Sequence, residues 1–263
     1  MRSSDGENKL LLGAYIPQAQ LGIYQNAFTL GTAVKFFTSA FETAWAPFYY
    51  ATARQPDARL TLGRMTTYAA AVLVLLVAGT TAVARDVVLV MLTPDYLPAV
   101  GVLPIVALAM ACQGAYLLTS IGLNLTSRTE FYPVATMLAA VVGLLAGFVL
   151  MPAWGVMGAA TALLAAYVVQ TSVAFAFARR FYPIPYEWSR LGRIVAAGVI
   201  AAGVARSLPD MPPIAGLLAR GSTTVLLFTG LLWATGFLRG TERAFLQEHL
   251  RRTGRVRGET RRA

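Results

Sequence analysis

Residues 21–47 read LGIYQNAFTLGTAVKFFTSAFETAWAP, and this stretch decides what kind of fold the chain adopts. It is apolar and aromatic over about the 20 residues that a helix needs to cross a hydrocarbon core. Yet Lys35 stands near its middle, and Glu42 follows seven residues later. At about 3.6 residues per turn, this spacing puts both charges on one side of a helix, together with Gln25. We therefore expect one helix whose polar side carries a cation, an anion and an amide.

The two charges favour a cavity beside this helix. An ionisable side chain inside a membrane span usually faces a bundle interior or a water-filled cavity, where it marks a path for a substrate or an ion. Lys35 and Glu42 therefore predict that the helix lines such a cavity. The alternatives are that both side chains reach the headgroups at the membrane surface, or that they bridge to neighbouring helices.

The composition of the whole chain places it in a membrane. Of its 263 residues, 57% are hydrophobic and only 13% are charged, and the mean hydropathy is +0.60. Soluble domains carry charges on about a quarter of their residues. The formal net charge of +10 might indicate nucleic acid, but residues 239–263 hold eight Arg and three acids, which is half of the excess. We expect an integral membrane protein with a lipid bilayer, and no nucleic acid, as its partner.

The apolar runs predict an all-α fold, a polytopic transmembrane bundle of about seven helices. Residues 1–20 are expected to be a polar segment with the remnant of a preceding helix, residues 21–238 the bundle, and residues 239–263 an Arg-rich cytoplasmic tail. Arg85 and Asp86 interrupt the apolar run after the second span. The expected spans are 21–47, 65–84, 99–123, 133–151, 156–177, 194–204 and 214–237.

A short uncharged turn is expected between the fourth and fifth spans. The sequence PAWG at residues 152–155 contains both Pro and Gly, which mark turns. Small residues on either side, among them Gly143, Gly147 and Gly158, allow two helix backbones to approach closely. This pattern predicts helix packing rather than chemistry.

Arginine alternates between successive loops. The loops after the first, third and fifth spans carry Arg54, Arg59, Arg64, Arg128, Arg179, Arg180, Arg190 and Arg193, whereas the loops between them are nearly balanced or uncharged. The positive-inside rule places the basic loops in the cytoplasm. With seven spans, we expect a cytoplasmic C-terminus and an external N-terminus. Such an arrangement suits the C-terminal part of a longer transporter, and the alternative is a short protein that inserts with its N-terminus outside.

Three stretches together resemble one family of transporters. They are LGIYQNAFTL running into FETAWAPFYY at residues 21–50, TPDYLPAVGVLPIVAL at residues 93–108, and MPAWGVMGAATALLAAYVV at residues 151–169. In order and spacing they resemble the C-terminal half of the polysaccharide-biosynthesis flippases of the multidrug/oligosaccharidyl-lipid/polysaccharide exporter superfamily. The resemblance covers about residues 10–167.

The resemblance implies a flippase of the bacterial cytoplasmic membrane. Such a protein moves a polyprenyl-diphosphate-linked oligosaccharide, a precursor of exopolysaccharide or O-antigen, by alternating access between two halves of a bundle. This chain would supply one half, and its partner would be an N-terminal half or another copy. The candidate substrate-binding residues are Lys35, Glu42, Gln25, Arg85 and Arg220.

These candidates have distinct expected roles. Lys35, with Arg85 or Arg220, would attract the diphosphate, because a cation binds an anion more strongly in a medium of low dielectric constant. Glu42 would restrain Lys35 or exchange a proton. The alternative is that Arg85 anchors its helix at the interface and that Arg220 extends towards the headgroups.

No enzyme is predicted. His249 is the only histidine, so neither a His-based triad nor a His-containing metal cluster is possible, and no phosphate-binding loop of the G-x-x-x-x-G-K-[ST] type occurs. We expect no metal and no cofactor. Two other functions stay open, a drug or cation antiporter of the same superfamily and a scaffold or half-transporter that is inactive alone.

Overall fold

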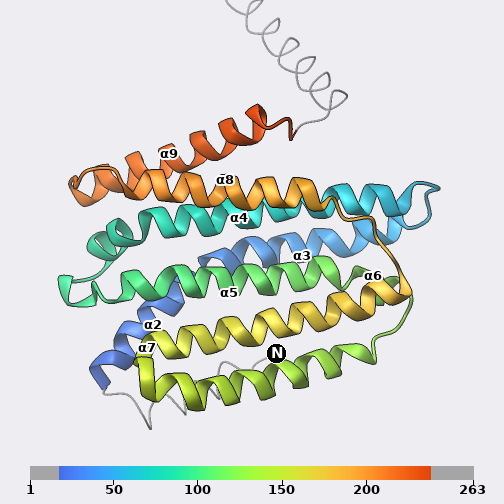
Figure 1. The fold of residues 1–263 in the computed structure, drawn as a ribbon, viewed down its shortest axis with the longest axis horizontal. Helices are drawn as coiled ribbons and strands as arrows, with labels where there is room; N and C mark the ends of the chain where they lie inside the picture. Colours follow the sequence, from blue (N-terminus) through green and yellow to red (C-terminus); the bar gives the residue numbers. More distant parts are fainter. Residues whose placement is uncertain (1–17, 238–263) are drawn as a thin grey trace, which may run out of the picture.

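The computed structural model describes residues 18–237, and these residues form helices without any strand. Figure 1 shows most of the helices lying side by side along the longest axis of the molecule. The all-α bundle predicted from the sequence is confirmed for these residues. The helices are α2 (Gln18–Gly31), α3 (Ala33–Thr52), α4 (Ala58–Met91), η1 (Pro94–Tyr96), α5 (Ala99–Thr119), α6 (Ile121–Leu125), α7 (Phe131–Phe181), α8 (Trp188–Arg206) and α9 (Pro213–Ala234).

The apolar helices give the chain the character of a membrane protein. Among the described residues, five helical stretches are long and apolar enough to cross a bilayer, namely α4, α5 with α6, α7, α8 and α9. The stretch α7 consists of two helices that are joined at a kink, so it provides two helical segments of the bundle. α2 and α3 are not among the five. The first expected span, which these two helices form, is therefore not a stretch that is long and apolar enough to cross a bilayer.

α5 lies at the centre of the bundle. Half of its most apolar window is buried, against 22–39% for the other four stretches. It packs between α4 and α7, and α2 and α3 also contact it. Val102, Leu103, Val106 and Met110 are almost completely buried there. Small buried residues such as Ala107, Ala109 and Gly114 let the neighbouring helices approach α5 closely, and such close packing holds helices together where lipid gives no hydrophobic drive.

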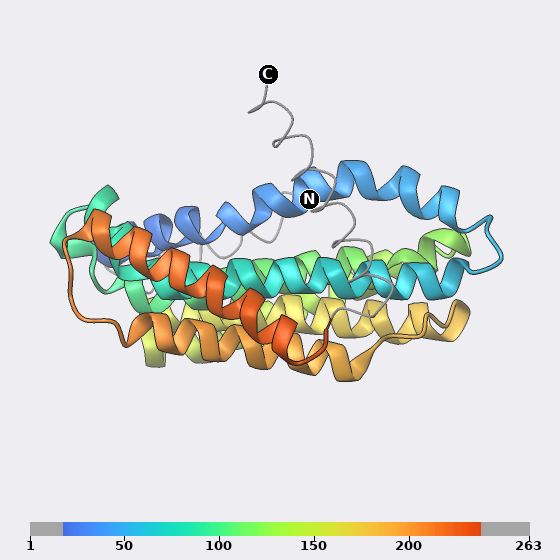
Figure 2. The same ribbon diagram turned by 90° about the horizontal axis from the view of Figure 1, so that it is seen from above.

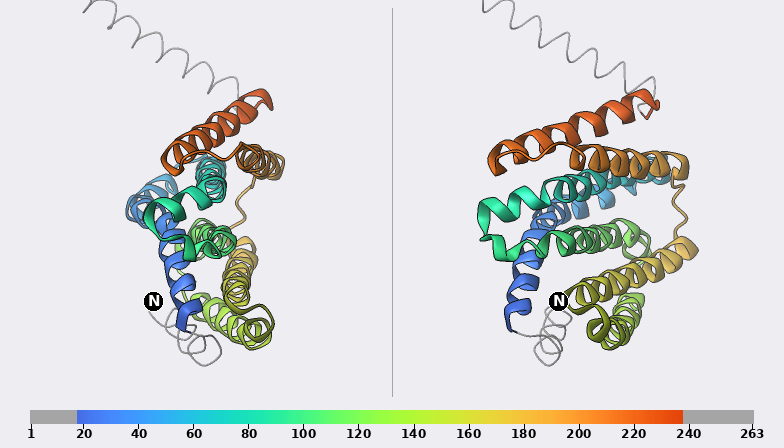
Figure 3. Two further views of the ribbon diagram at one scale, coloured as in Figure 1. Left: turned by 90° about the vertical axis from the view of Figure 1, so that its left-hand side faces the viewer. Right: turned by 60° about the vertical axis from the view of Figure 1, so that its left-hand side comes forward.

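A second, smaller core joins α8 and α9 to α4. Ile194 of α8 and Phe228 of α9 are buried in it together with Ala71 of α4. Figure 3 shows α8 and α9 at one edge of the bundle and the two halves of α7 at the opposite edge. In Figure 2, α9 crosses α4 and α8 obliquely. α4 is therefore the helix that connects the two cores.

The turn predicted at residues 152–155 is present. Gly155 has φ 53° and ψ −125°, a conformation that side-chain-bearing residues rarely adopt, and it divides α7 into two antiparallel halves (Figure 1). The halves approach closely, since a Cβ on Gly143 would lie 3.1 Å from the Cβ of Ala166. Gly158 is tighter still, because a Cβ there would lie 2.1 Å from the Leu150 carbonyl oxygen.

The alternate connections lie at opposite ends of the bundle. Figure 1 shows the loops 53–57, 126–130 and 182–187 at one end. The connections 92–98 and 207–212 and the turn at Gly155 lie at the other end. The first three loops and the helix ends beside them carry most of the arginines of the described chain. We call this side of the molecule the basic end.

Several expected helix boundaries are wrong. The second span was expected over residues 65–84, but α4 continues through Arg85 and Asp86 to Met91. The first span was expected to end at Pro47, but α3 contains this proline and continues to Thr52. Apolar periodicity does not locate these ends, because polar residues that have partners in the fold can be part of a long helix.

Two of the expected segments lie outside the described residues. These are most of the N-terminal segment 1–20 and the Arg-rich tail 239–263.

The close contact at Gly158 yields a prediction. Replacing Gly158 by Ala should lower the free energy of unfolding by about 1–3 kcal/mol, because the new methyl group overlaps a backbone carbonyl that cannot move aside easily. The measurement is the loss of helical circular dichroism on heating in detergent micelles. Gly192→Ala is the matched control, since nothing lies within 4 Å of a Cβ at that position. Equal melting temperatures for the two variants would contradict the packing described above.

Candidate functional site

The polar side of the predicted first span lies on two helices instead of one. The helix expected over residues 21–47 is broken at Thr32, between α2 and α3. Gly31 packs against α5, where a Cβ would lie 2.7 Å from a methyl group of Val106. The Thr32 hydroxyl donates to the Thr29 carbonyl at 2.7 Å. A hydroxyl bonded to the local backbone beside a glycine favours a break over a continuous helix.

α3 has a buried face and an exposed face. Val34, Thr38, Trp45 and Tyr49 are buried against the bundle. Among the residues of this helix whose exposure is described, the exposed ones are Lys35, Phe36, Ser39, Glu42, Thr43, Pro47, Tyr50 and Ala51. Gln25 is exposed on α2. The structure thus places Lys35 and Glu42 on a part of α3 that the other described residues, within 18–237, leave open.

The polar groups beside the two charges are already satisfied. The Ser39 hydroxyl donates to the Phe36 carbonyl at 3.1 Å, and the Thr43 hydroxyl donates to the Ser39 carbonyl at 3.1 Å. Within residues 18–237, neither the Lys35 ammonium nor the Glu42 carboxylate makes an ion pair or a side-chain hydrogen bond. Two unpartnered charges therefore mark the exposed face of α3.

A shallow depression lies on the inner side of α3. It leaves about 10 Å³ for the centre of a water molecule, which is room for about one water, and its lining residues are Thr38, Phe41, Ala69, Leu73, Gly114, Leu117 and Leu118. Apart from Thr38, these residues are apolar, and neither Lys35 nor Glu42 is among them. Pockets that hold drug-sized ligands usually have about 300 Å³ or more. The depression is therefore too small and too apolar to hold a lipid-linked sugar.

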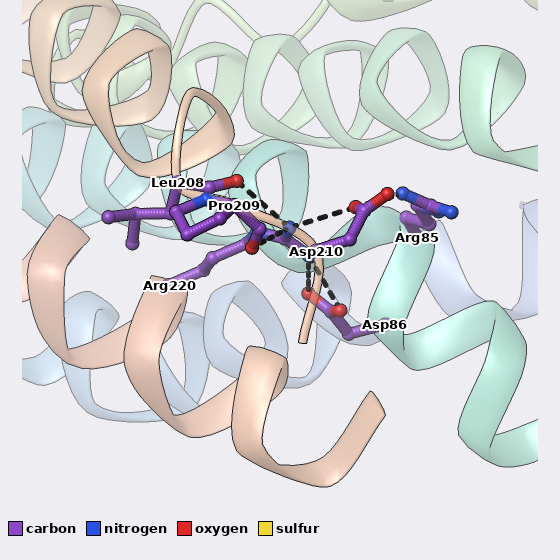
Figure 4. Close-up of polar contacts among 6 residues, drawn as sticks. All are labelled: Arg85, Asp86, Leu208, Pro209, Asp210 and Arg220. Atoms are coloured by element: carbon purple, nitrogen blue, oxygen red, sulfur yellow. Dashed lines mark hydrogen bonds and ion pairs between the residues drawn. The ribbon is translucent and has the colours of Figure 1, made fainter. Parts of the chain in front are cut away.

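Arg85 and Arg220 belong to a different cluster, at the end of the bundle opposite to the basic end. Figure 4 shows the Arg220 guanidinium between Asp86 of α4 and the loop that connects α8 to α9. Its Nη1 donates to both carboxylate oxygens of Asp86, at 2.7 and 2.8 Å. Its Nη2 donates to the carbonyls of Leu208 and Pro209, each at 3.3 Å.

Asp210 joins the remaining arginine to this cluster. Its carboxylate contacts Arg85, and one of its oxygens lies 3.6 Å from Nη2 of Arg220 (Figure 4). Gly216 of α9 makes room for the buried pair, because a Cβ there would lie 2.4 Å from an Asp86 oxygen. Two arginines and two aspartates thus fasten α9 and the α8–α9 loop to α4.

This geometry changes the reading of Arg220. From the sequence, Arg220 is expected either to bind a diphosphate or to extend towards the headgroups. In the structure only 5% of Arg220 is exposed. Its charge is neutralised by Asp86, which is 2% exposed. Burial with a carboxylate partner leaves no open side for a large anion. Arg85 remains exposed, but it is paired with Asp210 and lies on a different helix from Lys35 and Glu42.

Sequence reasoning missed the roles of Asp86 and Asp210. The pair Arg85–Asp86 inside an apolar run was the available signal, but it was read as a boundary. Asp86 is instead a helix-interior partner for a residue 134 positions away. Only the packing of α9 on α4 could reveal this contact.

A second buried arginine, Arg190, fastens the other end of α8 and α9. Its Nη1 donates to Glu187 at 2.7 Å, and its guanidinium lies over the Phe237 ring at 4.3 Å. Arg193 donates to the carbonyl of Thr235 at 2.9 Å, beyond the end of α9. These arginines, which the sequence assigned to topology alone, also hold the helices together.

The comparisons with known proteins found no relatives. No protein-family model, no curated protein and no solved structure matches the chain.

The buried cluster predicts a large stability difference between its two arginines. Replacing Arg220 by Met should cost about 3–5 kcal/mol, because it leaves the Asp86 carboxylate buried without a partner. Replacing Arg85 by Gln should cost less than about 1 kcal/mol, because that ion pair is exposed. Titration of the protein in mixed micelles with sodium dodecyl sulfate measures both free energies of unfolding.

A double variant separates the charge from the packing. Combining Arg220→Met with Asp86→Leu should recover much of the loss, because no unpaired charge remains. If Arg220→Met were no more destabilising than Arg85→Gln, the buried ion pair would not hold α9 to α4.

Proposed function

We propose that this chain takes part in moving a lipid-linked oligosaccharide across the bacterial cytoplasmic membrane, as a flippase or as one half of one. The observation that carries the proposal is the exposed face of α3, with Lys35 and Glu42 unpartnered among residues 18–237. Such a face is costly against lipid tails, so it is more stable beside water, a polar substrate or another protein. The resemblance of three stretches to polysaccharide flippases supports this choice of substrate.

Lys35 is the residue that we propose binds the substrate's diphosphate. An ammonium in a medium of low dielectric constant attracts a diphosphate far more strongly than it does in water. Glu42 lies two turns away on the same helix, so it is placed to attract Lys35 when the site is empty and to be repelled by the bound diphosphate. Gln25 on α2 would add a neutral donor for the sugar.

The exposed face of α3 needs a cover that residues 18–237 do not provide. We propose that a second copy of the chain, or another helical chain, lies opposite this face and closes the path for the substrate. The size of the substrate supports this arrangement, because the depression on the inner side of α3 is too small to hold it.

We also propose an orientation in the membrane. The basic end carries exposed arginines such as Arg54, Arg64 and Arg193, whereas the opposite end has Arg85 balanced by Asp210. The positive-inside rule assigns the basic end to the cytoplasm.

A flipping assay tests the function. Proteoliposomes with the purified chain would contain a polyprenyl-diphosphate sugar with a dithionite-sensitive fluorophore, and dithionite outside the vesicles would report lipid that reaches the outer leaflet. We expect wild type to bleach the label faster than empty liposomes do. Lys35→Ala should slow the transfer about tenfold or more, because a charged hydrogen bond to the diphosphate is lost. Lys35→Arg, which keeps the cation, should retain most of the rate.

The outcomes separate the three open functions. If Lys35→Ala flips as fast as wild type, Lys35 does not bind the diphosphate. An antiporter would be favoured if the chain exports a drug in a cation-driven way, if Glu42→Gln abolishes this export, and if Lys35→Ala does not. A scaffold would be favoured if liposomes that contain the wild-type chain bleach no faster than empty liposomes. This result would have to hold both for the chain alone and after candidate partner chains are added.

Cysteine labelling tests the orientation independently. Cys112 is the only cysteine, so Cys112→Ser provides a background without thiols. In right-side-out vesicles, a membrane-impermeant maleimide should label Ser207→Cys, in the α8–α9 loop, directly. Gln55→Cys, in the loop between α3 and α4, should react only after the membrane is opened. The reverse pattern would contradict the proposed orientation.

A further inference from the structure

Four arginines gather around two adjacent aromatic residues at the basic end. Arg59 of α4 lies over the Tyr182 ring, with its Cζ 5.0 Å from the ring centroid. Arg128 of the α6–α7 loop lies over the Phe181 ring at 5.4 Å. Arg179 and Arg180 belong to the last turn of α7, directly before these two rings. Three elements that are distant in sequence thus bring arginines to the end of α7, beside Phe181 and Tyr182.

The aromatic residues beneath these arginines are held in place. Phe131 stacks on Phe177 at 4.4 Å and contacts Phe181 at 5.3 Å. α6 approaches Tyr182 closely, because a Cβ on Gly122 would lie 3.2 Å from the Tyr182 Cβ. The N–H groups of a guanidinium lie in the plane of the group. When the flat face of the guanidinium lies over a fixed ring, these N–H groups stay free to donate to phosphate oxygens.

The charges of the cluster are only partly neutralised. Glu130 pairs with Arg128 at 3.2 Å, and hydrogen bonds from its own backbone and from Arg128 hold the pKa of Glu130 below its usual range. Asp57 precedes Arg59 by two residues. Within residues 18–237, Arg59, Arg179 and Arg180 make no ion pair. All four arginines are exposed, so the cluster keeps a net positive charge open to the surroundings.

The position of the cluster identifies its ligand. It lies where the apolar helices α4 and α7 begin and end, which is the level of the headgroups for a helix that crosses a bilayer. Trp188, exposed and 6.0 Å from the Tyr186 ring, lies at the same end, and Trp and Tyr are typical of the membrane interface. Basic pockets between helices at this level bind anionic headgroups.

We propose that Arg59, Arg128, Arg179 and Arg180 form a binding site for the phosphate of an anionic phospholipid headgroup. The guanidinium groups donate to the phosphate oxygens, and the apolar stretches of α4 after Arg64 and of α7 before Arg179 lie beside the acyl chains. This site depends on the membrane character of the chain and is independent of the proposed transport function.

Native mass spectrometry tests the site. The purified chain would be placed in mixed micelles with equal amounts of phosphatidylglycerol and phosphatidylcholine, and the ratio of the two bound lipids would be measured. Wild type should retain phosphatidylglycerol in preference. Arg59→Gln and Arg128→Gln should each lower the ratio about fivefold. Arg206→Gln is the matched control, since Arg206 is an exposed arginine at the opposite end, and it should change the ratio less than about twofold.

Three further variants separate charge from structure. Arg59→Lys and Arg128→Lys keep the charge but lose the planar fork, so each should retain only part of the preference, whereas Glu130→Gln removes the competing carboxylate and should raise the ratio. Circular dichroism checks that all variants keep the wild-type helicity. The proposal is overturned if the Gln variants keep the wild-type ratio or if Arg206→Gln lowers it equally. It is also overturned if millimolar inorganic phosphate displaces the lipid, because the site would then bind a free anion.

Discussion

A hydrocarbon layer offers no water to a polar group, and the described part of the chain is built around this constraint. Thr66, Thr67 and Thr224 are buried, and each hydroxyl donates to the carbonyl four residues earlier in its own helix. The buried Arg220 places its charge against both oxygens of Asp86. Nε1 of Trp45 and Nε of Arg220 are exceptions, being buried without a hydrogen-bond partner. On α3, Lys35 and Glu42 are charges that residues 18–237 leave without an ion pair.

The same constraint explains how the bundle holds two cores. α5 fills the larger core, and α4 turns one face to that core and another to α8 and α9. The second core is small, and buried arginines reinforce both of its ends, Arg220 beside Asp86 and Arg190 beside Glu187. Hydrophobic contacts are weak as a driving force between helices in lipid, so charged and close backbone contacts are needed to fix α8 and α9 in place.

Charged groups of this protein therefore have two kinds of role. The pairs around Asp86 and Glu187 are satisfied internally and stabilise the fold. The exposed face of α3 and the arginines around Phe181 and Tyr182 keep charge available to something outside the described chain. The diphosphate-bearing substrate proposed for the first surface and the anionic headgroup proposed for the second would each place a phosphate beside cations at the edge of an apolar environment.

The sequence alone determined the fold class, most of the apolar helices and the turn at Gly155, because hydropathy, helix length and glycine conformation are local properties. It also determined that basic loops alternate with neutral ones, which agrees with their places at the two ends of the bundle. Only the tertiary structure decided that Arg220 is buried against Asp86, that α2 and α3 separate at Thr32, and that Arg59 lies over Tyr182 and Arg128 over Phe181. Each of these features depends on contacts between residues far apart in the chain, and helical periodicity carries no information about which distant side chain will neutralise a charge.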